Sequence, residues 1–278
     1  YRYMNNKDTS WGKVANWYDT YLDAEDNYQA KVIWPNLERL LGSSASAMSK
    51  EEKITGGNLL DVACGQGYFS FLANKQGFSV VGSDIASELI QVANRRVEAE
   101  KAIKSGKEVP QPTFHTAPSH DMPFVPDNSQ DLAICVLALQ NIKELDLTFK
   151  EVARTLKNGG RFIFVLNHPS FRVPQHSDWY YDTKKGVQSR LVSKYMQETS
   201  IKIDMNPGIK NPRQKVYTAS FHRPLQLFVK FLSKNGFMIS RLEEWCSHKK
   251  TEAGPRKAAE DNARKEIPMF IAIEATLN

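Results

Sequence analysis

Apolar runs of strand length alternate with amphipathic stretches through the middle of the chain. The runs that read as strands are residues 59–63, 79–82, 132–137 and 161–166. Residues 87–104 and 149–156 place apolar side chains at helical spacing, and Gly159 and Gly160 are expected to end the second helix. Strands that alternate with helices in this way predict an α/β protein with a parallel sheet.

The alternation stops after residue 166. Residues 167–223 contain several prolines and aromatic residues, and two runs of β character, 200–205 and 215–221. This composition predicts an inserted cap. A helix that starts at Pro224 and two closing strands, 238–245 and 269–276, then complete the sheet.

Composition and charge narrow the class of protein. The 278 residues are 41% hydrophobic and 24% charged, which is enough for a full core, and no apolar stretch reaches the roughly 20 residues of a membrane span. The three cysteines lie in apolar segments without metal-ligand spacing, so we expect reduced thiols, a cytoplasmic location and no metal.

The net charge of +6 permits a nucleic-acid partner but does not favour one. The basic residues of 248–265 are mixed with acids, and no aromatic residues are interleaved for base stacking. A solvated loop and helix is the favoured interpretation of that segment. The oligomeric state is left open.

A glycine turn follows the first strand, with Asp61 before it and Gly65 and Gly67 within it. Such a turn lets a ligand approach the backbone closely. A dinucleotide fingerprint would place glycine where this chain has Ser70. The acid would repel a pyrophosphate, so it suits a cationic amino-acid ligand better; a tight turn without a ligand is the alternative.

Asp84 ends the second strand. A carboxylate at this point can accept both hydroxyls of a ribose, and the neighbouring Ile85 can lie against a purine. The alternative is an acid that only stabilises the start of the following helix.

Residues 59–84, together with Met-Pro-Phe at 122–124 and the segment 151–160, resemble the class I S-adenosylmethionine-dependent methyltransferases. The sequence is most similar to the small-molecule group that includes the quinone-biosynthesis C-methyltransferases. The resemblance implies a Rossmann-like fold, a mostly parallel seven-stranded sheet with helices on both faces and a cap inserted after the fifth strand. The parts expected are an N-terminal helical lid and linker (1–56), a cofactor-binding core (57–166), a substrate cap (167–223) and the C-terminal part of the core (224–278).

The resemblance also implies S-adenosylmethionine as cofactor and S-adenosylhomocysteine as product. The glycines would pass under the methionine part, the first acid would order the turn and the amino group, and the second would bind the ribose. The cofactor-binding residues expected are Asp61, Ala63, Gly65, Gly67, Asp84, Ile85, Ser119, His120, Tyr18 and Tyr21, the two tyrosines as a lid.

The sequence indicates the residues that would bind the methyl acceptor less clearly than those that would bind the cofactor. His168 and His222 are candidate bases for an acceptor that loses a proton, and Arg223 is a candidate for a substrate carboxylate or phosphate. The expected pocket residues are Trp179, Tyr180, Tyr181 and Gln140. Structural roles are the alternatives: a turn at the first histidine, helix caps at the second histidine and the glutamine, and a core of the cap for the aromatics.

The sequence therefore predicts an S-adenosylmethionine-dependent methyltransferase that acts on a small, partly apolar acceptor. A methyltransferase for RNA or protein is the first alternative, because the positive charge permits it. A non-catalytic module that binds S-adenosylmethionine is the second, and turnover of labelled cofactor would distinguish it from either enzyme.

Overall fold

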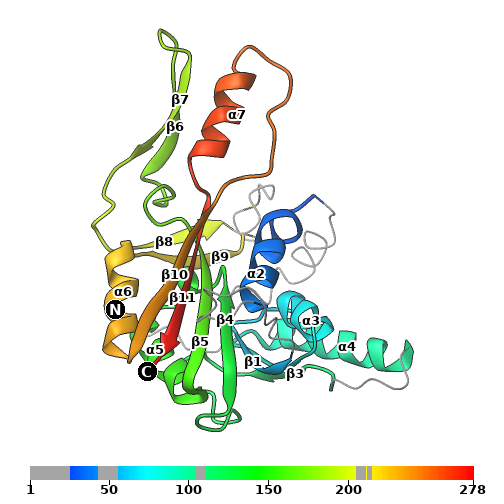
Figure 1. The fold of residues 1–278 in the computed structure, drawn as a ribbon. Helices are drawn as coiled ribbons and strands as arrows, with labels where there is room; N and C mark the ends of the chain where they lie inside the picture. Colours follow the sequence, from blue (N-terminus) through cyan, green and yellow to red (C-terminus); the bar gives the residue numbers. More distant parts are fainter. Residues whose placement is uncertain (1–25, 43–55, 104–109, 205–210, 212–214) are drawn as a thin grey trace.

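A twisted seven-stranded sheet forms the centre of the computed structural model, which describes residues 26–42, 56–103, 110–204, 211 and 215–278 (Figure 1). In sheet order the strands are β10 (Phe237–Trp245), β11 (Phe270–Leu277), β5 (Leu156–Asn167), β4 (Gln130–Val136), β1 (Gly57–Val62), β2 (Phe78–Asp84) and β3 (Thr113–Thr116). β11 runs antiparallel to both neighbours, and the other adjacent strands are parallel. The mostly parallel seven-stranded α/β sheet is confirmed.

Helices cover both faces of this sheet. The helical elements are η2 (Gln29–Ile33), α2 (Trp34–Leu41), α3 (Tyr68–Lys75), α4 (Ser87–Ile103), η3 (Leu139–Asn141), α5 (Leu145–Thr155), α6 (Leu225–Lys234) and α7 (Lys257–Glu266). α5 and α6 share one buried cluster with Phe162 and Phe164 of β5, whereas η2, α2 and α3 pack on Ile163 and Val165. Since successive strand side chains point to opposite faces, these helices lie on opposite sides of β5.

The start of β5 differs from the prediction. α5 ends at Thr155, four residues before the glycine pair, and Leu156 is already extended. A Cβ on Gly160 would lie 2.7 Å from the carbonyl oxygen of Lys157, and Gly159 has a φ of +76°. The glycines therefore permit a tight backbone turn within the first part of β5, and they do not end the helix.

Two antiparallel strand pairs are inserted between β5 and α6. β6 (Ser177–Asp182) pairs with β7 (Val187–Val192), and β8 (Thr199–Asp204) pairs with β9 (Tyr217–His222). The second pair matches the two runs of β character expected in the cap. The β6–β7 hairpin had no signal in the pattern of apolar residues.

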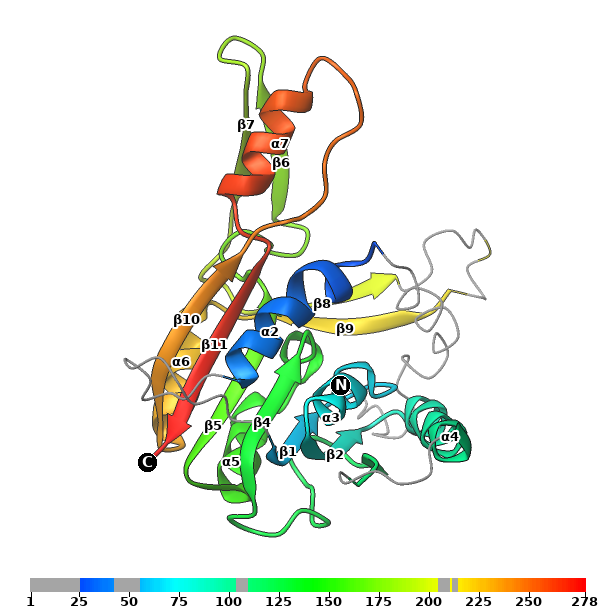
Figure 2. The same cartoon turned by 45° about the vertical axis from the view of Figure 1, so that its right-hand side comes forward.

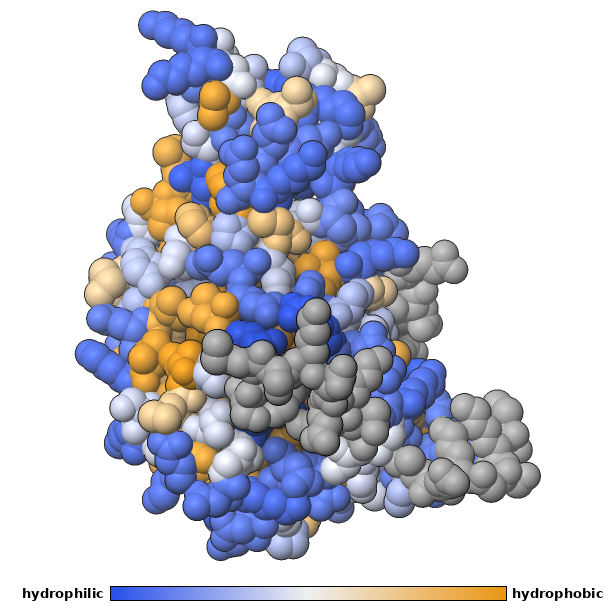
Figure 3. Space-filling view, viewed as in Figure 1, coloured by the Kyte–Doolittle hydropathy of each residue, from blue (hydrophilic) through white to orange (hydrophobic). Residues whose placement is uncertain are grey.

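The hairpin stands away from the sheet together with α7, which belongs to the connection between β10 and β11 (Figure 2). α7 packs against β7, and the guanidinium of Arg256 lies 4.6 Å from the ring centre of Tyr181. On the face seen in Figure 3 this upper lobe is mainly hydrophilic, whereas apolar residues gather on the side where α6 lies. The basic segment thus includes a helix that packs on the inserted hairpin.

Candidate active site

The turn after β1 bends through three left-handed residues: Ala63, Gly65 and Gly67 have φ values of +56°, +58° and +81°. A Cβ on Gly67 would lie 2.6 Å from the Phe114 ring, so this glycine is required by close packing. A Cβ on Gly65 would meet no atom of the described residues within 4 Å. Open space above a left-handed glycine at a helix N-terminus is where a ligand can contact the backbone.

Asp61 lies under this turn and is 2% exposed. Its Oδ2 accepts a hydrogen bond of 2.6 Å from the hydroxyl of Ser70, which ties the end of β1 to α3. Burial first, and then the negative charge of Asp84, raise the pKa of Asp61 to about 7 against the lowering effect of the hydrogen bond from Ser70.

Asp84 ends β2 beside the turn. Its Oδ2 accepts the N–H of Gly65 at 2.9 Å and its Oδ1 accepts the N–H of Ala86 at 2.8 Å, so the carboxylate is fixed in orientation. Burial raises its pKa as well. The next residue, Ile85, is 39% exposed and can contact a ligand.

Neither buried carboxyl forms an ion pair with a described cationic residue. Two acids without a counter-ion disfavour each other's charge, and a bound cation would compensate for both. S-adenosylmethionine carries an ammonium and a sulfonium group. The donor set therefore fits this cofactor, and the contacts of Asp61 with its cationic part and of Asp84 with its ribose stay predictions.

The segment expected at the adenine follows β3. The hydroxyl of Ser119 is 2.8 Å from that of Thr148 on α5, so this side chain links the segment to a helix. His120 is half-buried. The adenine roles of Ser119 and His120 stay predictions, and the expected lid residues Tyr18 and Tyr21 lie outside the described residues.

A cavity of about 290 Å³ opens at the carboxyl end of β5, enclosed by β9 and the segment that leads into the hairpin. Its described lining includes the apolar residues Leu166, Phe221 and Phe228. In the sheet β5 is two strands from β1, a separation of about 10 Å. The cavity and the glycine turn therefore lie along the same edge of the sheet.

The two candidate bases have different surroundings. His168 is buried, donates from Nε2 to Glu244 at 2.6 Å and accepts the N–H of Ser170 at Nδ1, so both ring nitrogens are engaged. His222 lines the cavity, and its Nε2 donates to the carbonyl oxygen of Tyr195 at 2.8 Å. Because a carbonyl oxygen only accepts, Nδ1 is the basic nitrogen of a neutral His222 ring.

The side chain of Arg223 is bound by backbone carbonyl oxygens. Its guanidinium donates to the carbonyl oxygens of Leu139, Ile142 and Lys143 at 3.4, 2.9 and 2.8 Å. Burial lowers its pKa. The residue lines the cavity, and these bonds tie the end of β9 to η3 and the residues that follow it; its substrate role stays a prediction.

Gln140 also lines the cavity. Its amide donates to the carbonyl oxygen of Leu137 at 2.6 Å, while its buried Oε1 has no hydrogen-bond partner among the described residues. Leu137 itself has a φ of +55°, a strained value for a non-glycine residue. A strained backbone next to an unpaired buried oxygen is typical of a ligand site.

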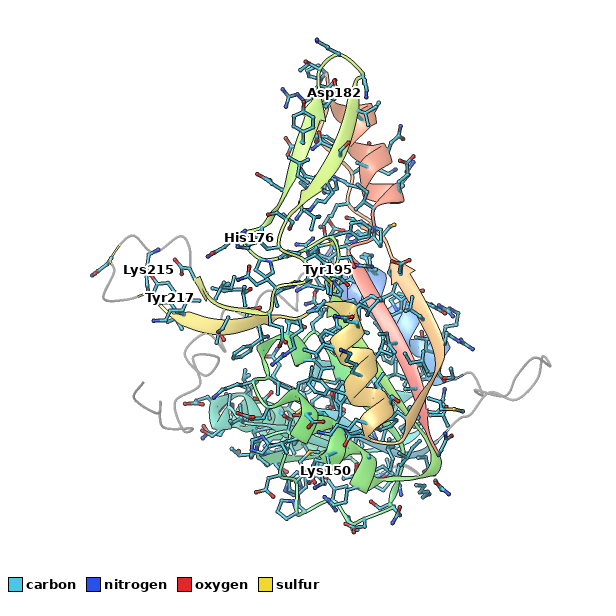
Figure 4. All side chains as sticks on the ribbon, turned by 90° about the vertical axis from the view of Figure 1, so that its left-hand side faces the viewer. Lys150, His176, Asp182, Tyr195, Lys215 and Tyr217 are labelled. Atoms are coloured by element: carbon cyan, nitrogen blue, oxygen red, sulfur yellow. The ribbon has the colours of Figure 1, made fainter. Side chains whose placement is uncertain are left out.

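The three aromatics expected in the acceptor pocket are all on the hairpin. The guanidinium of Arg190 lies over the Trp179 ring, 5.0 Å from the centre of that ring. Trp179 also lines a second, smaller cavity. Tyr180 and Tyr181 belong to neither described cavity lining, and Figure 4 shows Asp182, at the end of the same strand, far from the body of the protein. Their substrate roles stay predictions.

Two residues of this region were not singled out from the sequence as site residues. Arg172 lines both cavities. Tyr195 binds His222 through its carbonyl and accepts the N–H of Leu225 at its hydroxyl at 2.9 Å, at the start of α6 (Figure 4). No local pattern marks Arg172, and Tyr195 stands out in the sequence only as one of the aromatic residues of the cap, because its partner His222 is distant in the sequence.

Comparisons with known proteins agree with this architecture. Residues 60–164 match the family model described as a methyltransferase domain. The demethylmenaquinone methyltransferase of Symbiobacterium thermophilum is 36% identical over 111 residues, which are 39% of this chain and 41% of that protein. The probable S-adenosylmethionine-dependent methyltransferase CRG1 of Saccharomyces cerevisiae is 26% identical over 170 residues, or 60% and 55% of the two chains. The chain thus spans about half of the curated relatives that it matches.

Solved structures resemble a larger part of the chain. An S-adenosylmethionine-dependent methyltransferase from Mesorhizobium loti superposes with a TM-score of 0.63 at 23% identity, covering 90% of this chain and all 100% of that one. A putative methyltransferase of the same type from Listeria monocytogenes gives 0.57 at 25% identity, covering 80% and 91%.

The sheet order, the glycine turn with its two acids and the match of residues 60–164 to a methyltransferase domain point to one class of protein. The fold is that of the class I S-adenosylmethionine-dependent methyltransferases. Among the described helices none is both long and apolar enough to cross a membrane, and the described residues hold no cluster of three or more metal-ligating side chains.

Proposed function

We propose that this protein transfers a methyl group from S-adenosylmethionine to a small, partly apolar acceptor bound in the cavity at the end of β5. The observation that carries the proposal is the position of that cavity on the same sheet edge as the glycine turn. At about 290 Å³ it is at the lower end of small-molecule sites, so it suits a compact acceptor. Relatives named as menaquinone and ubiquinone methyltransferases support a small-molecule acceptor.

The bound cofactor would supply an electrophilic methyl group, so the protein mainly has to bind and align the two reactants. Asp84 would hold the ribose, Asp61 would balance the cationic methionine part, and the open backbone at Gly65 would admit it. Leu166, Phe221 and other apolar lining residues would exclude water from the acceptor.

His222 is the residue we assign to remove a proton from the acceptor. It lines the cavity, and its Nδ1 is left basic by the bond from Nε2 to Tyr195. His168 has both nitrogens engaged, and we assign it a positioning role at the end of β5. We also propose that the protein acts in the cytoplasm, since Cys64, Cys135 and Cys246 are free thiols.

The test incubates the full chain and labelled S-adenosylmethionine with a cell extract divided into small molecules and macromolecules. Label is expected in the small-molecule fraction, and its product can be identified by mass spectrometry. Label in RNA or protein would overturn the proposal. Binding of the cofactor without methylation of any fraction would instead identify a non-catalytic module.

A pair of variants tests the assignment of His222 as the base. His222→Gln is expected to lower kcat about a hundredfold with little change in cofactor affinity, as loss of a general base does. His248→Gln is the control, because His248 binds Asp26 on the surface. Equal activity of His222→Gln and wild type would remove the assignment.

A further inference from the structure

The described lining of the larger cavity is positively charged. It includes Arg172, Arg190 and Arg223, and no aspartate or glutamate. Guanidinium groups remain charged at any pH at which the protein is folded. Positive charges that surround one partly dehydrated space attract an anion to it.

Two of these arginines already have neutral partners. Arg223 donates to three backbone carbonyls, as described above. Arg190 donates from Nε to the carbonyl oxygen of Phe171 and from Nη2 to the hydroxyl of Ser177, both at 2.8 Å. These bonds fix the two guanidinium groups in position. No carboxylate of the described residues bonds to either group, although the charges of Glu198 and Glu144 act on Arg223, and that of Asp178 on Arg190, from a longer distance.

Arg172 is different, because its guanidinium has no hydrogen bond or ion pair with any described residue. It lines both cavities and is an exposed residue, but nearby protein atoms still remove part of the water around its guanidinium. This partial dehydration, and then the positive charge of Arg190, lower the pKa of Arg172. A bidentate anion such as a carboxylate or phosphate would supply its missing partner.

Gln140 adds an unmet acceptor to the same space. Its buried Oε1 lacks a donor among the described residues, so a hydroxyl group on a bound molecule would satisfy it. Leu166, Phe221 and Phe228 supply the apolar part of the lining.

We propose that the methyl acceptor is a small hydroxy acid whose anionic group, a carboxylate or a phosphate, is bound by Arg172. The acceptor hydroxyl donates to Gln140, and the apolar body of the molecule lies against Leu166, Phe221 and Phe228. This inference rests on the proposed function and adds the chemical class of the acceptor.

The test measures binding of matched probes to the full chain by calorimetry in the presence of S-adenosylhomocysteine. 4-Hydroxybenzoate is compared with the neutral 4-hydroxybenzamide, and 4-hydroxyphenyl phosphate with the neutral hydroquinone. In at least one pair the anion is expected to bind about tenfold tighter or more, since a charge-assisted bond is worth roughly that factor. The pair with the larger difference identifies the anionic group.

Arg172→Gln is expected to remove this preference and leave affinity for S-adenosylhomocysteine unchanged, which also shows that the variant is folded. Arg256→Gln is the matched control, because Arg256 stacks on Tyr181 outside the cavity lining and should keep the preference. The inference is overturned if neither pair favours the anion, or if Arg172→Gln retains the preference. Failure of the wild type to bind S-adenosylhomocysteine would refute the proposed function itself.

Discussion

The variant Asp84→Asn tests the ribose contact, when its effect on cofactor affinity is measured separately from its effect on stability. The two carboxylate oxygens accept one backbone N–H each, from Gly65 and from Ala86. Asparagine keeps one oxygen and turns an NH₂ group toward the other N–H, which loses its acceptor at a cost of about 1–3 kcal/mol in stability. The ribose loses a charged acceptor worth about 1.5–3 kcal/mol, so the affinity for S-adenosylhomocysteine should fall about tenfold to a hundredfold.

The assay combines titration calorimetry with urea unfolding, and Asp131→Asn is the control. Asp131 accepts the N–H of Asn58 at 2.8 Å and pairs with Lys157 at 2.6 Å at the opposite end of the sheet. Both variants should lose stability, but only Asp84→Asn should lose affinity. If Asp84→Asn is folded and binds S-adenosylhomocysteine as tightly as wild type, the ribose assignment is refuted.

Three further predictions concern the turn and the cavity. Asp61 keeps its proton up to about pH 7 in the folded protein and only up to about pH 3.8 in the unfolded chain. The free energy of unfolding without ligand should therefore fall by up to about 4 kcal/mol as the pH rises between these values. Urea unfolding measured across this pH range should show the fall in wild type and not in Asp61→Asn. Gly65→Val should weaken cofactor binding in calorimetry, whereas Gly67→Val, whose side chain collides with Phe114, should cause the larger fall in Tm of the two variants. A larger fall in Tm for Gly65→Val would contradict the open space over Gly65. Arg223→Met should destabilise the protein to urea by about 2–4 kcal/mol, since three carbonyls lose a buried donor, and unchanged stability would show that the tie is not needed.

Much of the core could be predicted because its signals are local. Apolar runs located six of the seven strands of the main sheet to within a few residues, apart from the start of β5, where the glycine pair is equally compatible with a helix stop and with a turn inside a strand. The short strand β3 was not predicted. The turn, with its acid and glycines, is contained within ten residues and could be predicted from spacing alone. Only the packed structure shows that Asp61 and Asp84 are buried together and that no cationic side chain of the described segments pairs with them.

The acceptor site could not be predicted in the same way, because it depends on contacts between residues that are distant in the sequence. Arg223 is a reasonable anion ligand as an isolated arginine, but carbonyls some 80 residues away in the chain occupy its guanidinium. Arg172 carries the same charge and has no such partner among the described residues, and nothing in its neighbours along the chain distinguishes the two. Side-chain type suggests what an arginine can bind, but only the packed environment shows which arginine is unoccupied.

The upper lobe is built from two insertions that pack against each other. The β6–β7 hairpin interrupts the chain after β5, and α7, which covers β7, interrupts it between β10 and β11. A hairpin transplanted alone into a related core would leave the face beneath Arg256 and its helix uncovered. Recombination that exchanges one insertion should therefore yield poorly soluble chimaeras, and divergence of this lobe should proceed by paired changes in two segments more than 60 residues apart.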